Sequence, residues 1–583
     1  MKRLIIILTV CCLIAGCGQT AQNESTEIVT SPTVATGIEL PDVDDSLVTI
    51  QTGTTSESGD AIITLSDSGI EINGSGASAE GSVLTVTASG TYILSGTLSD
   101  GQIRVDTDSS ETVKLILSGI DVTCSDGPAI YILNAQKKVV LELATDSVNK
   151  VEDGETYSDT STDAPSAAIY SKEDLDIQGS GTLYVTGNYN KGIQTNDDLS
   201  IEGGTLIVTA VDDGIRGKDS IEISGGNITI YAGADGLRTN NETDVDKGYI
   251  EITSGEIYIE AGQDGIQAVT DCSIFGGTIA IECGGGSENS SQTSESWGSW
   301  GGGGRGGFGG GGQQSSSSSS SSSDGTSAKG IKAAGELSIS GGTFSIDSSD
   351  DALHSNGNLT IISGEIYISS GDDGIHADDT LLISGGVITV EQSYEGLEAL
   401  NVTINGGEIS VVASDDGINA AGGNDGSSMN GRPGQNSFAS SSSGLVTIAG
   451  GVVLIDASGD GIDSNGNIVQ TGGSATVFGP TNSANGPLDF AGSFELSSGT
   501  FIAVGAVGMA QTISDCAQGQ IAVTLNANEN STVTVTASNG TEVLSFTTPK
   551  RIECLVCSAP TLVSGQTYTI SVDGSALGDI QAQ

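Results

Sequence analysis

An internal repeat with a period near 22 residues constrains the fold of this chain more than any other feature. One anchor of the repeat has the form Ile-x-Gly-Gly, then an apolar residue two places on, and it begins at Ile201, Ile223, Ile339, Ile383 and Ile404. A second anchor, most often Asp-Gly-Ile, has its glycine at positions 192, 214 and 236, and again at 374, 396 and 417. Such regular steps indicate one small unit stacked many times.

Each unit contains three short alternating segments separated by Gly-rich turns, for example Leu199–Ile201, Leu206–Thr209 and Gly214–Gly217. No segment has an apolar period of 3.6 residues long enough for a helix. Three strands of about 3 to 5 residues and three turns make one coil of a parallel β-helix, whose inward residues stack into ladders. The sequence therefore predicts an all-β chain built on such coils, with one inward ladder formed by Ile215, Leu237, Ile266, Ile331, Leu353, Ile375, Leu397, Ile418 and Ile462.

The N-terminus has the pattern of a bacterial targeting segment. Lys2 and Arg3 precede an apolar run that is too short for an ordinary transmembrane helix. The run ends in Ile14-Ala15-Gly16-Cys17, which resembles a lipobox, and that resemblance implies cleavage before Cys17 and a lipid on its sulfur. The alternative is a plain signal peptide with a chance cysteine. The lipobox predicts a protein anchored on the extracellular face of the membrane.

Composition and patterning predict five parts. Residues 1–16 are the lipoprotein signal peptide, and 17–60, rich in Thr, Ser, Gln and Glu, are expected to form a flexible tether. Residues 61–166 are expected to hold an N-terminal β-rich part and the first coils, 167–489 the β-helix, and 490–583 a C-terminal β cap. A Gly/Ser insert at 284–327, expected to be disordered, and a loop at 422–443 interrupt the β-helix.

Charge excludes one class of partner. The 583 residues include 74 acidic and 19 basic side chains, so the formal net charge is −55. Nucleic acid would be repelled by such a chain before any base could be read.

Acidic residues recur at the turn before the third strand of successive units. Stacked carboxylates would lie about 5 Å apart and would repel unless a cation lay between them, and Ca²⁺ accepts six to eight such oxygens. In the alternative interpretation the Asp-Gly turns are plain turns, in which Asp caps its own backbone and Gly adopts positive φ. The doubled Asp-Asp turns favour calcium, and the candidate ligands are Asp212, Asp213, Asp235, Asp264, Asp350, Asp351, Asp372, Asp373, Glu395, Asp415 and Asp416.

Basic and imidazole side chains follow the inward Ile or Leu of the third strand, where alternation points them outward. We expect Arg216, Arg238, Lys332, His354 and His376 to form an exposed polar ladder that binds carbohydrate. The alternative is that the two histidines share a metal.

Two lysines bear on whether the protein is an enzyme. A polysaccharide lyase needs a base beside a cation, and Lys191 and Lys329 occupy turn slots that hold Asp in other units. The simpler interpretation is that they offset the stacked negative charge, which predicts a protein that is not an enzyme.

The repeat pattern Ile-Ser-Gly-Gly-x-Ile-x-Val with Asp-Asp-Gly-Ile-His, the opening segment at 70–76 and the closing segment at 558–568 together resemble a known family. It is the bacterial carbohydrate-binding family of pectate-lyase-like right-handed β-helices, typified by a clostridial surface protein that binds cellulose and polygalacturonate. The resemblance covers about residues 60–583. It implies a right-handed β-helix with structural Ca²⁺ that binds cellulose-like or pectin-like glycans at the cell surface. A calcium-dependent pectate lyase and a structural adhesin without sugar affinity are the alternatives.

Overall fold

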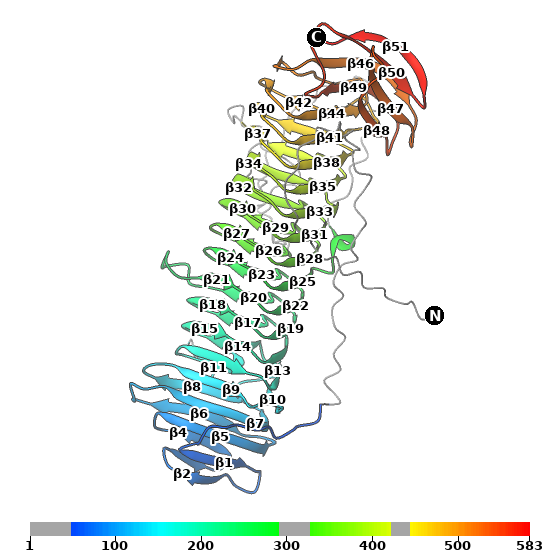
Figure 1. The fold of residues 1–583 in the computed structure, drawn as a ribbon. Coiled ribbons are helices and arrows are strands. Elements are labelled where there is room, and N and C mark those ends of the chain that lie inside the picture. Colours follow the sequence, from blue (N-terminus) through cyan, green and yellow to red (C-terminus); the bar gives the residue numbers. More distant parts are fainter. Residues whose placement is uncertain (1–47, 162, 291–326, 421–443) are drawn as a thin grey trace, which may run out of the picture.

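The computed structural model describes residues 48–161, 163–290, 327–420 and 444–583. Its regular structure in these ranges is β-strand apart from one short 3₁₀ helix, η2, at Ser287–Asn289. The strands are stacked along one long axis, with the N-terminal strands at one end and the C-terminal strands at the other (Figure 1). The prediction of a nearly all-β chain is therefore confirmed.

Parallel pairing joins most strands of the central stack to the strand three places later in the chain, or two places later where one long strand spans two columns. For example, β16 (Thr205–Ala210) pairs with β19 (Asn227–Ala232), which pairs with β22 (Glu256–Ala261). This rule sorts the strands into three columns. β32 (Ile375–Ile383) and β34 (Leu397–Ile404) each run through a turn and belong to both the third and the first column.

The bounds of the remaining strands follow column by column. The first column contains β9 (Val139–Leu143), β12 (Leu175–Gly179), β15 (Asp198–Ile201), β18 (Ser220–Ile223), β21 (Tyr249–Ile252), β24 (Cys272–Ile274), β27 (Leu337–Ile339), β30 (Asn358–Ile361), β37 (Leu445–Ile448), β40 (Asn467–Gln470), β43 (Phe494–Leu496) and β45 (Asp515–Cys516). The second contains, besides β16, β19 and β22, the strands β10 (Val148–Asp153), β13 (Thr182–Gly187), β25 (Thr278–Cys283), β28 (Thr343–Ser348), β31 (Glu365–Ser370), β33 (Val387–Gln392), β35 (Glu408–Ala413), β38 (Val452–Ala457), β41 (Ser474–Phe478) and β44 (Thr500–Gly505). The third contains β8 (Ile130–Ala135), β11 (Ala167–Ser171), β14 (Lys191–Thr195), β17 (Ile215–Gly217), β20 (Leu237–Thr239), β23 (Ile266–Ala268), β26 (Ile331–Ala333), β29 (Leu353–Ser355), β36 (Ile418–Ala420), β39 (Ile462–Ser464) and β42 (Asp489–Phe490).

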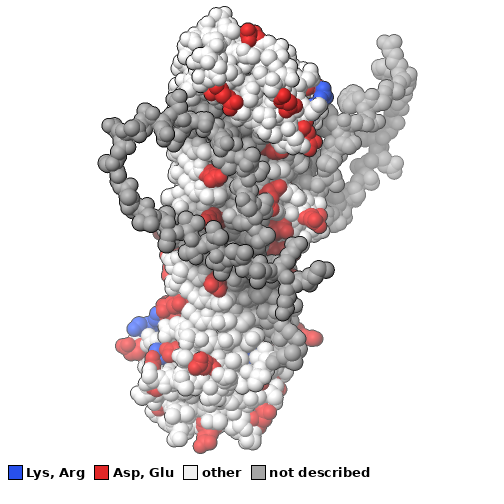
Figure 2. All heavy atoms as spheres, turned by 45° about the vertical axis from the view of Figure 1, so that its right-hand side comes forward, with Lys and Arg blue, Asp and Glu red and all other residues white. Residues whose placement is uncertain are grey.

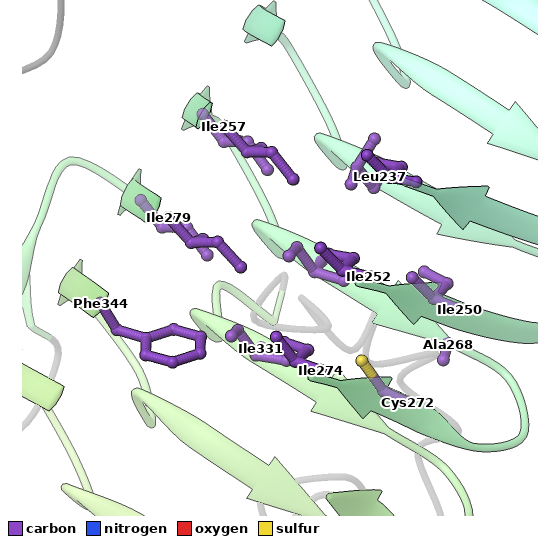
Figure 3. Close-up of a cluster of buried hydrophobic side chains, with 14 of the residues drawn as sticks. Leu237, Ile250, Ile252, Ile257, Ala268, Cys272, Ile274, Ile279, Ile331 and Phe344 are labelled. Carbon is purple, nitrogen blue, oxygen red and sulfur yellow. The ribbon is translucent and has the colours of Figure 1, made fainter. Parts of the chain in front are cut away.

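The core is a set of apolar ladders inside the three columns. Every neighbouring pair in the predicted ladder from Ile215 to Ile462 is in register, and each of its side chains is fully buried. In the second column Ile257, Ile279 and Phe344 form another ladder, while Cys272 replaces an aliphatic residue in the first (Figure 3). Each fully buried aliphatic side chain stabilises the stack by roughly 1.5–3 kcal/mol.

Two glycines that recur in the repeat are required for different reasons. The second glycine of the Gly-Gly anchor has positive φ, for example 98° at Gly226, so only glycine adopts that turn without strain. Gly214 of the Asp-Gly anchor is not among the glycines with positive φ. A Cβ there would lie 2.3 Å from the Ile230 side chain and 2.9 Å from the carbonyl oxygen of Gly236 in the next repeat. Close approach of the backbone therefore explains this glycine, and the expectation of positive φ is wrong.

Antiparallel strands lie at both ends of the stack and reduce its exposed edges. At the N-terminal end are β1 (Ala61–Leu65), β2 (Glu71–Gly74), β3 (Ala77–Glu80), β4 (Val83–Val86), β5 (Gly90–Leu98), β6 (Gln102–Thr107) and β7 (Val113–Cys124), with β1–β2 and β3–β4 antiparallel. At the C-terminal end β44, β46 (Gln520–Ala527) and β49 (Ile552–Ser558) pair antiparallel. A separate four-stranded sheet contains β47 (Thr532–Ala537), β48 (Glu542–Thr547), β50 (Thr567–Val572) and β51 (Ser575–Gln581).

The predicted boundaries need two corrections. The tether was expected to extend to residue 60, but Gln51 and Thr54 already form bridges with Val148 and Thr145, so the ordered chain begins earlier. The insert was expected to begin at 284, but residues 284–290 fold back on the stack, where the Ser287 N–H donates to Asp347 Oδ1 at 2.6 Å. Residues 291–326, the loop at 422–443 and the lipobox with Cys17 lie outside the described residues. No helix in the described ranges is long and apolar enough to cross a membrane.

Candidate functional site

A polar ladder runs along the outer side of the third column, one position after the inward Ile or Leu. Neighbouring residues pair in parallel register, so their side chains emerge one above another along the molecule. We call this set the polar ladder, and it contains Tyr131, Tyr170, Gln194, Arg216, Arg238, Gln267, Lys332, His354, His376, Glu398, Asn419, Asp463 and Asp489.

A second set, the turn column, lies three residues before the ladder residues and is acidic. It contains Asp213, Asp235, Asp264, Asp351, Asp373, Glu395, Asp416 and Asp460. Several of its carboxylates accept a hydrogen bond from the backbone N–H of the next repeat. Asp235 accepts from Asp264 at 3.0 Å, and Asp351 accepts from Asp373 at 3.1 Å. The expectation that each Asp caps its own backbone is therefore wrong for these turns, because the cap joins successive repeats.

Basic side chains balance the first half of the turn column. Arg216 and Arg238 of the ladder pair with the carboxylates three residues before them, at 3.4 Å and 2.8 Å. Lys332 lies 3.8 Å from Asp264. These three ladder side chains stay 21%, 32% and 22% exposed, so they can still reach a ligand.

The two candidate lyase bases are also ion-paired. Lys191 Nζ lies 2.7 Å from Asp212, and Lys329 Nζ lies 3.0 Å from Asp350 and 2.5 Å from Asp351. Burial opposes the charge of Lys329, but Asp351 and Asp350 outweigh it and hold the pKa of this ammonium group well above its usual value. A protonated, nearly inaccessible lysine cannot accept a proton from a substrate.

The two histidines are buried, which corrects the expectation of an exposed ladder at this point. His354 is 5% exposed and His376 is fully buried, and their rings stack with centroids 4.7 Å apart and planes 8° apart. Their surroundings differ. Burial and nearby Lys329 lower the pKa of His354, whereas three carboxylates hold the pKa of His376 well above its usual value against the effect of burial.

Near Asp463, the side chains that could bind a metal ion are all carboxylates. The carboxylates of Asp416, Asp460 and Asp463 lie within 4.8 Å of one another, and no basic side chain is recorded as their ion-pair partner in the described residues. Burial and neighbouring carboxylates raise the pKa of Asp463 to about 7 and that of Asp460 to about 6. Carboxylates so close together suit a hard cation such as Ca²⁺, so the donor set fits calcium.

Sequence reasoning found some of the acidic residues of the polar ladder and the turn column and missed others. Asp415 and Asp416 were predicted from the doubled Asp motif, but Asp463 and Glu398 belong to the polar ladder and were not recognised as partners of the turn residues. The three-residue offset between ladder and turn, visible in Asp460-Gly-Ile-Asp463, is the signal that identifies them.

Unused hydrogen-bonding atoms concentrate on these two sets. Eight buried side-chain atoms in the described residues have no hydrogen-bond partner, and six of them belong to the polar ladder or the turn column. The six are Asp213 Oδ1, Arg216 Nε, Arg238 Nε, Gln267 Oε1, Glu398 Oε1 and Asn419 Oδ1. Buried polar atoms are normally satisfied, so this side of the molecule is the leading candidate for a ligand.

A hollow of about 310 Å³ lies elsewhere, against the first column, and is lined by Tyr249, Glu251, Asp246 and Asp271 among others. It shares no residue with the polar ladder. Its three carboxylates and lack of basic lining residues make it a poor site for an acidic sugar.

Comparison with known proteins identifies the family of the chain. The family described as Carbohydrate-binding domain-containing protein matches residues 80–374 and 372–571. The chain belongs to this family. A protein with that same description from Acetivibrio thermocellus is 42% identical over 127 residues, which are 21% of this chain and 44% of the relative. This chain therefore matches less than half of that relative's length.

A solved structure is also similar in part. It is the polysaccharide lyase-like protein from C. thermocellum, in a gadolinium derivative, and it is 39% identical to the matched region with a TM-score of 0.38. The match covers 39% of this chain and 92% of that one.

Proposed function

We propose that this member of the carbohydrate-binding family is a cell-surface lipoprotein that binds polysaccharide along its polar ladder. The observation that carries the proposal is the row Arg216, Arg238, Gln267 and Lys332, which is partly exposed and contains three unsatisfied atoms. Paired strands repeat at about 4.8 Å, so this row offers hydrogen-bonding groups at regular steps to a polymer.

The row favours an acidic glycan of the polygalacturonate type over a neutral one of the cellulose type. Arginine forks bind carboxylates in a bidentate manner, whereas the rest of the molecule would repel a polyanion. The face in Figure 2 shows acidic side chains along the described surface and few basic ones. Attraction is therefore local to the ladder or to bound cations.

Calcium is part of the proposal and has a structural role. Asp415, Asp416, Asp460 and Asp463 would hold it, and its charge would relieve the repulsion among these carboxylates. The candidates at Asp212, Asp213, Asp235, Asp264, Asp350 and Asp351 are left out, because the structure pairs each with a basic side chain.

The proposed architecture is a right-handed parallel β-helix with a basic coil of 22 residues. In-register pairs such as Ile215 with Leu237 and Ile331 with Leu353 are separated by that number of residues, and every third strand pairs. We propose that a lipid on Cys17 anchors this β-helix to the extracellular face of the membrane, with residues 18–47 as the tether.

The protein is proposed to bind and not to cleave its glycan. Both lysines that could serve as a base are buried and ion-paired. A calcium-dependent lyase is the second candidate function, and an adhesin without sugar affinity is the third.

The decisive experiment is a pull-down of the purified full chain with polygalacturonate and with cellulose, run in calcium and again in chelator. We expect polygalacturonate binding to need calcium, and any cellulose binding to survive chelation. The double variant Arg216→Gln/Arg238→Gln should lose polygalacturonate binding, whereas Arg551→Gln, an exposed arginine of the C-terminal cap, should not. Unchanged binding by the double variant would move the site away from the ladder, and binding to no glycan would favour the adhesin.

A further inference from the structure

The polar ladder changes character at β29 and β32, where the imidazoles of His354 and His376 follow the arginine and lysine side chains of earlier repeats. His376 Nδ1 lies 3.0 Å from Asp373 Oδ2 and 2.9 Å from Glu398 Oε2. Glu398 comes from the next repeat, in register with His376. The three donor atoms lie within 4.8 Å of one another, and all three residues are buried.

Hydrogen bonds within this cluster do not satisfy all of its polar atoms. A single Nδ1–H faces two carboxylate oxygens, so it cannot make a full hydrogen bond to both. Glu398 is 2% exposed, and its other oxygen, Oε1, has no hydrogen-bond partner. Burying carboxylates without enough hydrogen-bond donors or counter-charge costs free energy, so this cluster suits a bound cation.

The distances suit a small metal ion. Donors about 2.1 Å from one ion and at right angles to each other are about 3.0 Å apart, given the usual metal–nitrogen and metal–oxygen bond lengths. The two measured separations from Nδ1, 3.0 Å and 2.9 Å, agree with that value.

The far side of the ring is already arranged as in a metal-bound histidine. His376 Nε2 lies 3.2 Å from Asp378 Oδ1. Metal-ligating histidines characteristically donate their other ring N–H to a carboxylate, which fixes the tautomer and leaves the opposite nitrogen free for the metal. Asp378 is on the same strand, two residues later, so β32 provides both the ligand and the group that orients it.

We propose that Asp373, His376 and Glu398 form a binding site for a divalent transition metal that accepts octahedral coordination, such as Mn²⁺ or Co²⁺, separate from the proposed calcium site. An imidazole nitrogen suits these metals, whereas Ca²⁺ takes oxygen ligands. The chain has only two histidines, so the site occurs once in a long repeat. This inference does not depend on the proposed glycan binding.

The test titrates the purified full chain, first stripped of metal and then kept in excess Ca²⁺, with Co²⁺. Calorimetry should show one Co²⁺ per chain, with the visible absorption of a protein-bound ion. The isosteric variant Glu398→Gln and the variant His376→Asn should both lose this binding. Asp378→Asn should weaken it about 10–100-fold, as expected for a group that orients a ligand.

The matched control is Asp379→Asn, which changes an exposed carboxylate on the same strand and should leave Co²⁺ binding intact. Circular dichroism establishes that each variant is folded. A second readout is paramagnetic resonance with Cu²⁺, in which coupling to a ligand nitrogen should be present in the wild type and absent in His376→Asn.

Three results would overturn the site. Equal Co²⁺ binding by His376→Asn would show that the histidine is not a ligand. Displacement of Co²⁺ by excess Ca²⁺ would show an oxygen-only site. Absence of Co²⁺ binding by the folded wild-type chain would show that His376 is simply a cation held by carboxylates.

Discussion

His354 and His376 lie in register on neighbouring repeats with their rings stacked 4.7 Å apart, yet their electrostatic surroundings are opposite. Burial and Lys329 lower the pKa of His354 although Asp351 lies 2.7 Å from its Nδ1, whereas the carboxylates around His376 raise its pKa against the effect of burial. The repeat determines where a side chain lies along the stack, whereas the side chains of neighbouring repeats determine its pKa and its hydrogen bonds.

Replacing Lys329 should destabilise the protein more than replacing an exposed lysine. Its side chain is 4% exposed and bonded to Asp350 and Asp351. Lys329→Met removes the ammonium partner of the buried Asp351, which keeps only His354 beside it, and breaking such a buried pair costs about 3–5 kcal/mol. Lys137→Met, whose side chain is 53% exposed, should change the free energy of unfolding by less than about 1 kcal/mol. Denaturant titration measures both.

The double variant Lys329→Met/Asp351→Asn distinguishes lost charge pairing from lost packing. Removing both charges should recover part of the stability that the single variant loses. Equal destabilisation of the single and double variants would indicate that packing, and not the unpaired carboxylate, dominates.

The ladder of buried Ile and Leu was predictable residue by residue, because an inward position must be apolar in every repeat. Glu398 as a partner of His376 was not predictable in the same way. The three-residue offset identifies Glu398 as a ladder residue, but its role depends on His376 one repeat earlier, and the offset does not say which side chains of neighbouring repeats bond to each other. The burial of both histidines was missed for a related reason, since alternation gives the direction of a side chain but not what covers it.

The pH dependence of stability should include a contribution from Asp153, which lies outside the polar ladder. Burial raises its pKa to about 6, although Tyr157 and two backbone N–H groups donate to it. Since the folded pKa is raised, the native state binds this proton more readily than the unfolded state does. The contribution is complete below the unfolded pKa of 3.8 and is lost as pH rises through about 6.

Asp153→Asn removes this titration and provides the measurement. The difference in free energy of unfolding between the variant and the wild type should change between about pH 4 and 7, with the wild type losing stability relative to the variant as pH rises. Asp159→Asn, which changes a fully exposed carboxylate, is the control and should give a much smaller change. A pH-independent difference for Asp153→Asn would show that its carboxyl does not titrate in this range.

Calcium should raise the melting temperature through the carboxylates near the end of the turn column. A ligand that binds only the native state at 100 times its dissociation constant stabilises it by about 2.7 kcal/mol. The double variant Asp416→Asn/Asp463→Asn should melt at the same temperature in calcium and in chelator. Glu408→Gln, an exposed carboxylate on β35, is the control and should keep the full calcium effect. A calcium effect that persists in the double variant would place the ion elsewhere.

The lipobox predicts that Cys17→Ser releases the protein from the membrane or leaves its precursor uncleaved. The thiol of Cys17 is the proposed point of lipid attachment, and serine cannot form the thioether. Fractionation of expressing bacteria, with immunoblotting of membrane and medium, measures both outcomes. Normal processing with unchanged membrane retention would exclude a lipoprotein. Cys124→Ser, a buried cysteine of the stack, controls for loss of a thiol in general.

Lyase activity should be absent, because both candidate lysines are buried and ion-paired. Elimination from a uronate requires an unprotonated base that can remove the proton on the carbon beside the carboxylate. The reaction yields an unsaturated product that absorbs in the near ultraviolet. Lys329 is held protonated by Asp351 and Asp350, and Lys191 is 7% exposed and bonded to Asp212. Polygalacturonate incubated with the full chain and calcium should therefore give no such absorbance from about pH 6 to about pH 9, where even an ordinary lysine stays mostly protonated. Product that forms with the wild type and disappears in Lys191→Ala or Lys329→Met, while glycan binding persists, would make this protein an enzyme.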